Sequence, residues 1–132
     1  MSSIDIRWYD EGQNVVVQEY RAEWRWEQLT HAMRTSFALM SHQDKPTALI
    51  VDMDHPDSMR RAEVGSFAQF QEIRKMAPPN LHLIIVVGVS TLMQSLARVY
   101  ILAINSMKVR VEFVETLAHA DQLLADFTSS SA

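Results

Sequence analysis

The order of the apolar segments constrains this chain more than any other feature. Two short segments with the character of strands, Ile4–Tyr9 and Val15–Tyr20, come first. Three further apolar runs follow, and each comes after a segment of helical periodicity: Ala48–Met53, Leu81–Val89 and Val109–Val114. Neighbouring parallel strands need a crossover of a dozen or more residues, which is usually a helix. The order therefore predicts a small α/β domain.

The first two segments have the alternation that is typical of a hairpin. In Ile4–Tyr9, apolar residues alternate with polar ones, which is the period of a strand with one solvated face. Residues 10–14 contain Asp, Gly and Asn, so they are predicted to form the turn, with positive φ at Gly12. We therefore expect the first strand to lie antiparallel at one edge of the sheet.

The segments before and after the later strands have the periodicity of helices. Apolar spacings of three and four residues predict helices from about Trp26 to Met40, Met59 to Met76 and Leu92 to Asn105. A last helix is expected after Thr116, which is predicted to be its N-cap. The predicted fold class is therefore α/β: a single-layer mixed five-stranded sheet, made of the N-terminal hairpin and three helix–strand units, with four helices.

The size of the chain and the absence of cysteine limit the classes of function. At 132 residues and 15.1 kDa, we expect one domain over residues 1–127 and a disordered tail over 128–132. The lack of cysteine excludes disulfides, thiol nucleophiles and thiolate metal sites, and it fits a reducing compartment. No signal peptide and no apolar run of ~18 residues are visible, so we expect a cytoplasmic protein without a membrane partner.

Charge and residue usage exclude further classes. The net charge is −4 and the basic residues are scattered, so nucleic acid is not an expected partner. Three glycines are too few for a glycine-rich phosphate loop. No two histidines have the spacing of a zinc site, so we expect ordinary surface or packing roles and no cofactor. The histidines are His31, His42, His55, His82 and His119.

Three local segments add to this order of elements. They are Glu23–Leu29 at the start of the first helix, Ala48–Asp52 in the middle strand and Phe113–Leu117 before the last helix. With the element order, they resemble the STAS superfamily, and within it the anti-sigma-factor-antagonist-like single-domain proteins of bacteria. The resemblance implies a protein-interaction module with a role in signalling rather than an enzyme.

The resemblance also implies a phosphorylation site. Some members of the superfamily are phosphorylated on a serine or threonine just after the middle strand, and Ser58 is the hydroxyl at the matching place. Pro56 and Asp57 stand where the family has an Asp-Ser-Ser-Gly or Asp-Ser-Thr-Gly run. A phosphate on Ser58 would be favoured by the positive end of the following helix and by an adjacent arginine pair. The alternative is that Ser58 or Asp57 only caps that helix.

Two polar segments at strand ends have a functional and an ordinary interpretation. Asp52, Asp54 and Asp57 form an acidic loop at the carboxyl end of the middle strand, where open α/β sheets bind ligands. These aspartates are weak candidates for a divalent metal, and the alternative is a solvated loop. Ser90 and Thr91 begin the predicted third helix and are candidates for binding an anion, or are a plain cap.

The predicted helix Leu92–Asn105 has a wider apolar surface than one face of a sheet requires. Met93, Ile101 and Leu102 are therefore predicted interface residues, together with Trp24, which we expect to point away from the core. The leading hypothesis is a non-enzymatic regulatory or scaffolding module that binds another protein, either as a homodimer or through a phosphoserine switch. The alternative is a small metal- or phosphate-dependent enzyme that uses the acidic loop.

Overall fold

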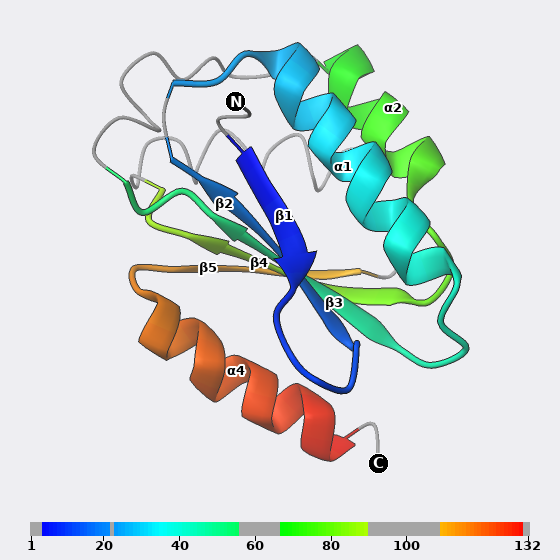
Figure 1. The fold of residues 1–132 in the computed structure, drawn as a ribbon, viewed down its shortest axis with the longest axis vertical. Coiled ribbons are helices and arrows are strands. Elements are labelled where there is room, and N and C mark those ends of the chain that lie inside the picture. The colour runs from blue at the N-terminus through cyan, green and yellow to red at the C-terminus, as the bar shows by residue number, and fades with distance from the viewer. Residues whose placement is uncertain (1–3, 22, 56–66, 90–108, 131–132) are drawn as a thin grey trace.

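The computed structural model describes residues 4–21, 23–55, 67–89 and 109–130. Within them the chain forms one five-stranded sheet with the strand order β1-β2-β3-β4-β5 (Figure 1). β1 is antiparallel to β2, and all other neighbouring strands are parallel. In chain order, the elements are β1 (Ile4–Trp8), β2 (Val15–Tyr20), α1 (Trp26–Ser41), β3 (Thr47–Asp52), α2 (Phe67–Met76), β4 (Leu81–Val87), β5 (Arg110–Val114) and α4 (Leu117–Ser130).

This arrangement confirms the predicted α/β class, the mixed five-stranded sheet and the antiparallel strand at one edge. Four helices were predicted, whereas the described residues contain three, namely α1, α2 and α4. The predicted helix Leu92–Asn105 lies outside the described residues, as does the first part of the helix predicted from Met59.

The helices cover both faces of the sheet. α1 and α2 lie over one face and α4 over the other (Figure 1). The parallel strands β2, β3 and β4 follow one another across the sheet, and right-handed crossovers in one direction place their helices on the same face. α4 follows the last strand, so it is not a crossover, and it packs against β4 and β5 from the opposite face.

Alternate side chains of the strands form two separate cores. On the α1 side, Val16 and other strand residues cluster with Phe37 of α1. On the α4 side, Ile50 and its neighbours cluster with Leu124 of α4. β3 is buried on both faces from Thr47 to Val51, which explains why its apolar run is unbroken.

The hairpin turn is organised by a side chain rather than by a glycine. Asp10 Oδ1 accepts hydrogen bonds from the backbone N–H groups of Asn14 at 2.9 Å and Val15 at 3.0 Å. The left-handed position is Gln13, with φ 55°, so the prediction of positive φ at Gly12 is wrong. The carboxylate of Asp10 closes the turn with two hydrogen bonds, and this offsets the strain of a non-glycine residue in that conformation.

The start of α4 was predicted correctly and its end was not. Thr116 Oγ1 accepts a hydrogen bond from the backbone N–H of His119 at 3.2 Å, which confirms Thr116 as the N-cap. α4 then runs to Ser130, so residues 128–130 are helical instead of belonging to a disordered tail. A helix that has already formed extends at little cost per residue, even through residues of modest propensity.

Gln18 is a fully buried polar side chain in the core on the α1 side. Its Nε2 donates to Ser36 Oγ at 2.9 Å and to Met33 Sδ at 3.4 Å, and its Oε1 accepts from the Tyr20 hydroxyl at 2.9 Å. The Ser36 hydroxyl donates in turn to the carbonyl of Ala32 at 2.8 Å. Burial raises the pKa of Tyr20 well above its ordinary value, so its hydroxyl remains a donor. The network ties β2 to α1 at one defined position.

Removing both partners of the hydrogen bond between Tyr20 and Gln18 is expected to destabilise the protein by less than the two single losses added together. Gln18→Leu leaves the Tyr20 hydroxyl buried without its acceptor, and Tyr20→Phe leaves Gln18 Oε1 without its donor, so each should cost about 1–3 kcal/mol. In urea unfolding, the double variant should be more stable than the sum of the two losses implies. Losses that add to within about 0.3 kcal/mol would contradict a shared hydrogen bond.

Candidate functional site

Charged side chains gather on the α4 side of the sheet, at the edge that β1 and β2 form. Along this face, Asp5 and Arg7 come from β1, Glu19 from β2 and Asp52 from β3, and Arg21 directly follows β2. α4 packs against β4 and β5, which lie at the other side of the sheet. We call these five residues the charged patch.

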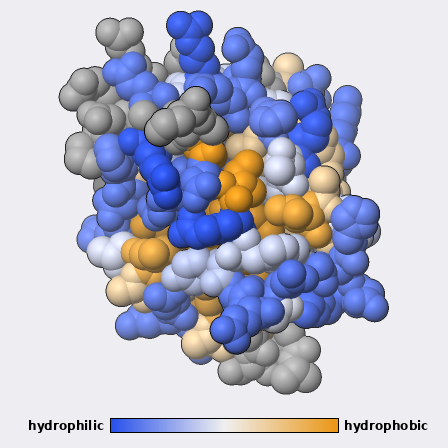
Figure 2. Space-filling view, in the orientation of Figure 1, coloured by the Kyte–Doolittle hydropathy of each residue, from blue (hydrophilic) through white to orange (hydrophobic). Residues whose placement is uncertain are grey.

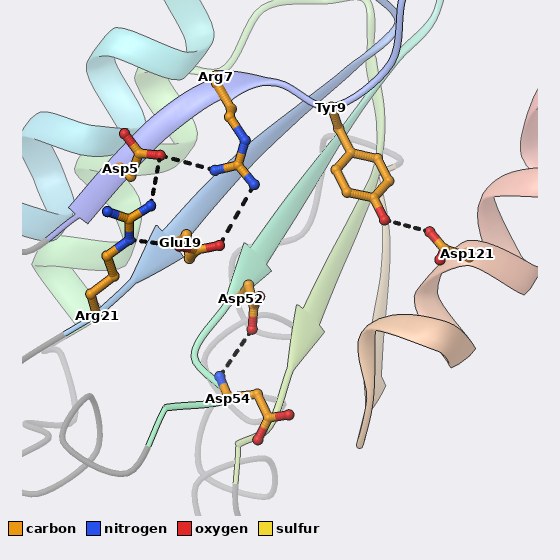
Figure 3. Close-up of polar contacts among 8 residues, drawn as sticks. All are labelled: Asp5, Arg7, Tyr9, Glu19, Arg21, Asp52, Asp54 and Asp121. Atoms are coloured by element: carbon orange, nitrogen blue, oxygen red, sulfur yellow. Dashed lines mark hydrogen bonds and ion pairs between the residues drawn. The ribbon is translucent and has the colours of Figure 1, made fainter.

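Four residues of the charged patch form a closed ring of ion pairs (Figure 3). Asp5 Oδ2 lies 3.0 Å from Arg7 Nη1 and 3.4 Å from Arg21 Nη2. Glu19 completes the ring, with Oε1 2.6 Å from Arg21 Nε and Oε2 3.6 Å from Arg7 Nη2. The four side chains are 32–59% exposed, and exposed ion pairs contribute only about 0–1 kcal/mol each. Their main effect is to hold the side chains in one arrangement.

Asp52 lies beside this ring at the carboxyl end of β3 (Figure 3). Its Oδ1 accepts a hydrogen bond from the backbone N–H of Asp54 at 3.0 Å. Partial burial raises the pKa of Asp52, and the negative charges of Glu19 and Asp54 raise it further, against the opposing effects of the Asp54 N–H and Arg7. Asp52 is therefore an aspartate whose charged form the fold disfavours, which is a common property of functional carboxylates.

The strand ends next to Asp52 are in close contact. The backbone N–H of Met53 donates to the carbonyl of Val87 at 2.9 Å, and that of Gly88 donates to the carbonyl of Val114 at 3.0 Å. Gly88 has φ +82°, and a Cβ atom added to it would lie 2.7 Å from Asp54 Cα. Only glycine fits this place, so Gly88 allows the close approach of Asp54 to the end of β4.

A hydrogen bond joins the hairpin to the last helix near the charged patch. The Tyr9 hydroxyl donates to Asp121 Oδ1 of α4 at 2.6 Å (Figure 3). Partial burial and this hydrogen bond raise the pKa of Tyr9 to about 12. The stabilisation from this contact is therefore complete below the ordinary tyrosine pKa of 10.0, and it is lost as the pH rises from there through about 12.

The predicted acidic loop is described only in part. Asp52 and Asp54 lie together at the end of β3, and Asp57 lies outside the described residues. In the described part of the chain, no group of three or more His, Asp or Glu side chains is placed to hold a metal ion. All five histidines are described and exposed, which confirms the expected surface positions.

Most of the other predicted site residues cannot be placed. Those outside the described residues are Ser58, Ser90, Thr91, Met93, Ile101 and Leu102. Trp24 is described, and it is only 6% exposed, so the structure does not support its prediction as an interface residue.

Trp24 is buried because the segment before α1 is extended rather than helical. Arg25, with φ −107° and ψ 160°, is the last extended residue before α1. In an extended segment, residues two apart point the same way, so Trp24 and Trp26 both enter the core. The ring of Trp24 packs edge-on against Tyr20 at 5.5 Å and lies 6.3 Å from that of Trp26, which is also buried.

The sequence interpretation missed the ring of ion pairs, although its signal is present. In the hairpin register, Asp5 lies opposite Glu19, and Arg7 opposite Val17. Charged residues stand at alternate positions in both strands, which is the signal of one charged face. The register is needed to know that the charges of the two strands lie next to each other.

Comparisons with protein-family models, with curated proteins and with solved structures found no match. Among the described residues, no helix is long and apolar enough to cross a membrane. The interpretation of the charged patch therefore depends on its own geometry.

Gly88→Ala is expected to destabilise the protein by about 2–4 kcal/mol, because alanine is strained at positive φ and its Cβ would overlap Asp54. Chemical unfolding measures this loss. The matched control is Gly12→Ala, because Gly12 is exposed and does not have positive φ, and its added Cβ would approach side-chain atoms rather than backbone, with Asn14 Nδ2 the nearest at 3.0 Å. The control should change stability by less than about 0.5 kcal/mol. Equal losses in the two variants would contradict the close approach at Gly88.

Asp52→Asn is expected to stabilise the protein at pH 7. The fold raises the pKa of Asp52, so the protonated side chain favours the folded state and the charged one does not. The stability that the protonated form contributes is lost as the pH rises from 3.8 through the raised pKa. Asparagine keeps the acceptor for Asp54 and has no charge. The stability gain measured by unfolding should shrink as the pH falls toward 3.8. Asp44→Asn, in an exposed loop, is the control, and an equal gain there would contradict this account.

Proposed function

We propose that this chain is a non-enzymatic regulatory or scaffolding module of the STAS type, which binds another protein through the charged patch. The observation that carries the proposal is the ring of Asp5, Arg7, Glu19 and Arg21 on an exposed sheet face. The element order supports it, because the described hairpin, the first two helix–strand units, β5 and the closing helix are among the elements on which the resemblance to the STAS superfamily is based.

The ion pairs favour binding because they organise the patch in advance. Long arginine side chains lose conformational entropy when a partner immobilises them, at about 0.5–1.5 kcal/mol for each side chain. Arg7 and Arg21 each already contact two carboxylates, so part of this cost is met in the free protein. Arginine is also enriched at protein interfaces.

The charge of the patch indicates the kind of partner. Two arginines lie among the carboxylates of Asp5, Glu19 and Asp52, with Asp54 adjacent. The local charge is therefore negative with two fixed positive groups, so a partner surface with an excess of lysine or arginine and at least one carboxylate is complementary. The candidate phosphoserine Ser58 is four residues after Asp54 in the sequence. The hypothesis of a phosphoserine switch is therefore kept as part of the same proposed function, the binding of another protein.

One observation favours the alternative of a metal- or phosphate-dependent enzyme. Asp52 has a raised pKa and stands at the carboxyl end of a central parallel strand, where ligands often bind. Thermal melts with Mg²⁺, Mn²⁺, nucleotides and inorganic phosphate discriminate between the two, because a ligand that binds the folded state raises the melting temperature. A clear rise that Asp52→Asn abolishes would favour the enzyme.

The interaction is tested with the double variant Arg7→Gln/Arg21→Gln and the control Arg34→Gln/Lys75→Gln, which removes two exposed positive charges from α1 and α2. Proteins retained on the immobilised wild type from a lysate of the source organism are identified, purified and titrated by calorimetry. We expect the patch variant to bind at least tenfold more weakly and the control to bind like wild type. Equal affinities for both variants would contradict a role of the charged patch.

A further inference from the structure

The outer edge of β1 has no neighbouring strand in the described sheet. β1 is the first strand of the order, and it pairs with β2 alone. The backbone N–H of Tyr9 donates to the carbonyl of Val15 at 2.7 Å, and that of Ala48 donates to the carbonyl of Asn14 at 2.9 Å. Residues of an antiparallel pair alternate between inward and outward hydrogen bonding. The N–H and C=O groups of Arg7 therefore point toward β2, and those of Ile6 and Trp8 point toward the outer edge.

The side chains of β1 separate by face. Ile4, Ile6 and Trp8 belong to the core on the α1 side, where Ile4 is buried and the other two are half-buried. Asp5 and Arg7 lie on the opposite face and are 43% and 46% exposed. The strand has no proline and no bulge, which are two of the devices that stop edge strands from pairing.

The sequence of β1 is complementary to itself in one antiparallel register. When two copies pair with Ile6 opposite Ile6, Asp5 of each copy lies opposite Arg7 of the other, and Ile4 lies opposite Trp8. Opposite charges that face each other across antiparallel strands stabilise the pairing, and like charges destabilise it. A shift of two residues in either direction sets Asp5 opposite Asp5, or Arg7 opposite Arg7. The charges therefore favour the register centred on Ile6 over both of its neighbours.

The surface beside the edge has room for the apolar side chains of a second strand. Ile4 and Ile6 line a shallow depression of about 220 Å³, together with Ala32, His31, Gln28 and Glu27 of α1. Figure 2 shows an apolar area over β1 with hydrophilic side chains around it. A second β1 strand in this register carries its own Ile6 and Trp8 on the same side of the sheet, next to this depression.

We propose that two copies of the chain associate through antiparallel pairing of their β1 strands, centred on Ile6. The two five-stranded sheets then form one continuous sheet across a two-fold axis. The outward N–H and C=O groups of Ile6 in each copy bond to those of the other, and two Asp5–Arg7 pairs flank them. This inference concerns the edge of β1 and a second copy, and it uses Asp5 and Arg7, which also belong to the charged patch. The two proposals are distinguished by their readouts, because self-association is measured on the purified chain alone.

Sedimentation equilibrium of the purified full chain tests the register. Asp5→Arg and Arg7→Asp each set like charges opposite one another at both cross-strand positions, so each variant should dimerise at least tenfold more weakly than wild type. An equimolar mixture of the two variants restores opposite charges at both positions. It should form a heterodimer with a dissociation constant within about threefold of the wild-type value, as expected when the same two pairs are present.

The controls are Asp44→Arg and Lys75→Asp, which make the same changes of charge at exposed positions outside β1. They should dimerise like wild type. At about 200 µM, a dimer of even millimolar affinity (about −4 kcal/mol) is detectable. A wild-type chain that stays monomeric at this concentration overturns the proposal. So does a dimer whose affinity is unchanged in both single variants.

A disulfide experiment covers the case in which a charge-reversed variant does not fold. The chain has no cysteine, so Asp5→Cys and Arg7→Cys each introduce a unique thiol. In the proposed register these positions face each other with Cα atoms about 4.5 Å apart, which is within the range of about 4.4–6.8 Å for disulfides. After oxidation of an equimolar mixture, the mixed disulfide should clearly exceed half of the crosslinked product. A statistical distribution of the three products contradicts the register.

Discussion

The register of the β1–β2 hairpin is the constraint on which the rest of the structure depends. The side chain of Asp10 closes the turn, and this sets Ile6 opposite Gln18. Because strand side chains alternate, one choice of register decides which residues of both strands face α1. In the observed register, the apolar residues of β1 and the hydrogen-bonded Gln18 face the core, and the charged residues of the two strands, Asp5, Arg7 and Glu19, face the other way. A slip by one residue would bury Asp5 and Arg7 against α1.

The elements could be predicted from sequence because their signals are local. An unbroken apolar run identified β3, alternation identified the hairpin, and the hydroxyl of Thr116 identified the start of α4. The errors came from positions where a distant or unusual contact decides the conformation. Gln13 takes the left-handed conformation because Asp10 holds the turn, and Trp24 is buried because the segment before α1 is extended. Neither effect follows from residue type and spacing alone.

The charged patch could be predicted only in part for a related reason. Asp52 and Asp54 were found because they directly follow a strand, where position in the chain implies position in space. The ring of Asp5, Arg7, Glu19 and Arg21 joins two strands, so it exists only in one register. The close approach of Gly88 to Asp54 joins two loops that are separated by an entire helix and strand. Contacts of this kind depend on sheet order, which a single sequence predicts poorly.

The hydrogen bond between Tyr9 and Asp121 has a consequence for synthesis of the chain. Its partners are 112 residues apart, and translation at about 5–20 residues per second separates their appearance by roughly 6 to 22 seconds. The strands β2 to β5 are synthesised one after another in that interval, and the apolar side chains of Ile50 and Ile85 have not yet met Leu124 of α4. The nascent chain therefore exposes apolar surface at the ribosome until its final helix emerges, and in that period chaperones that bind apolar segments have a substrate.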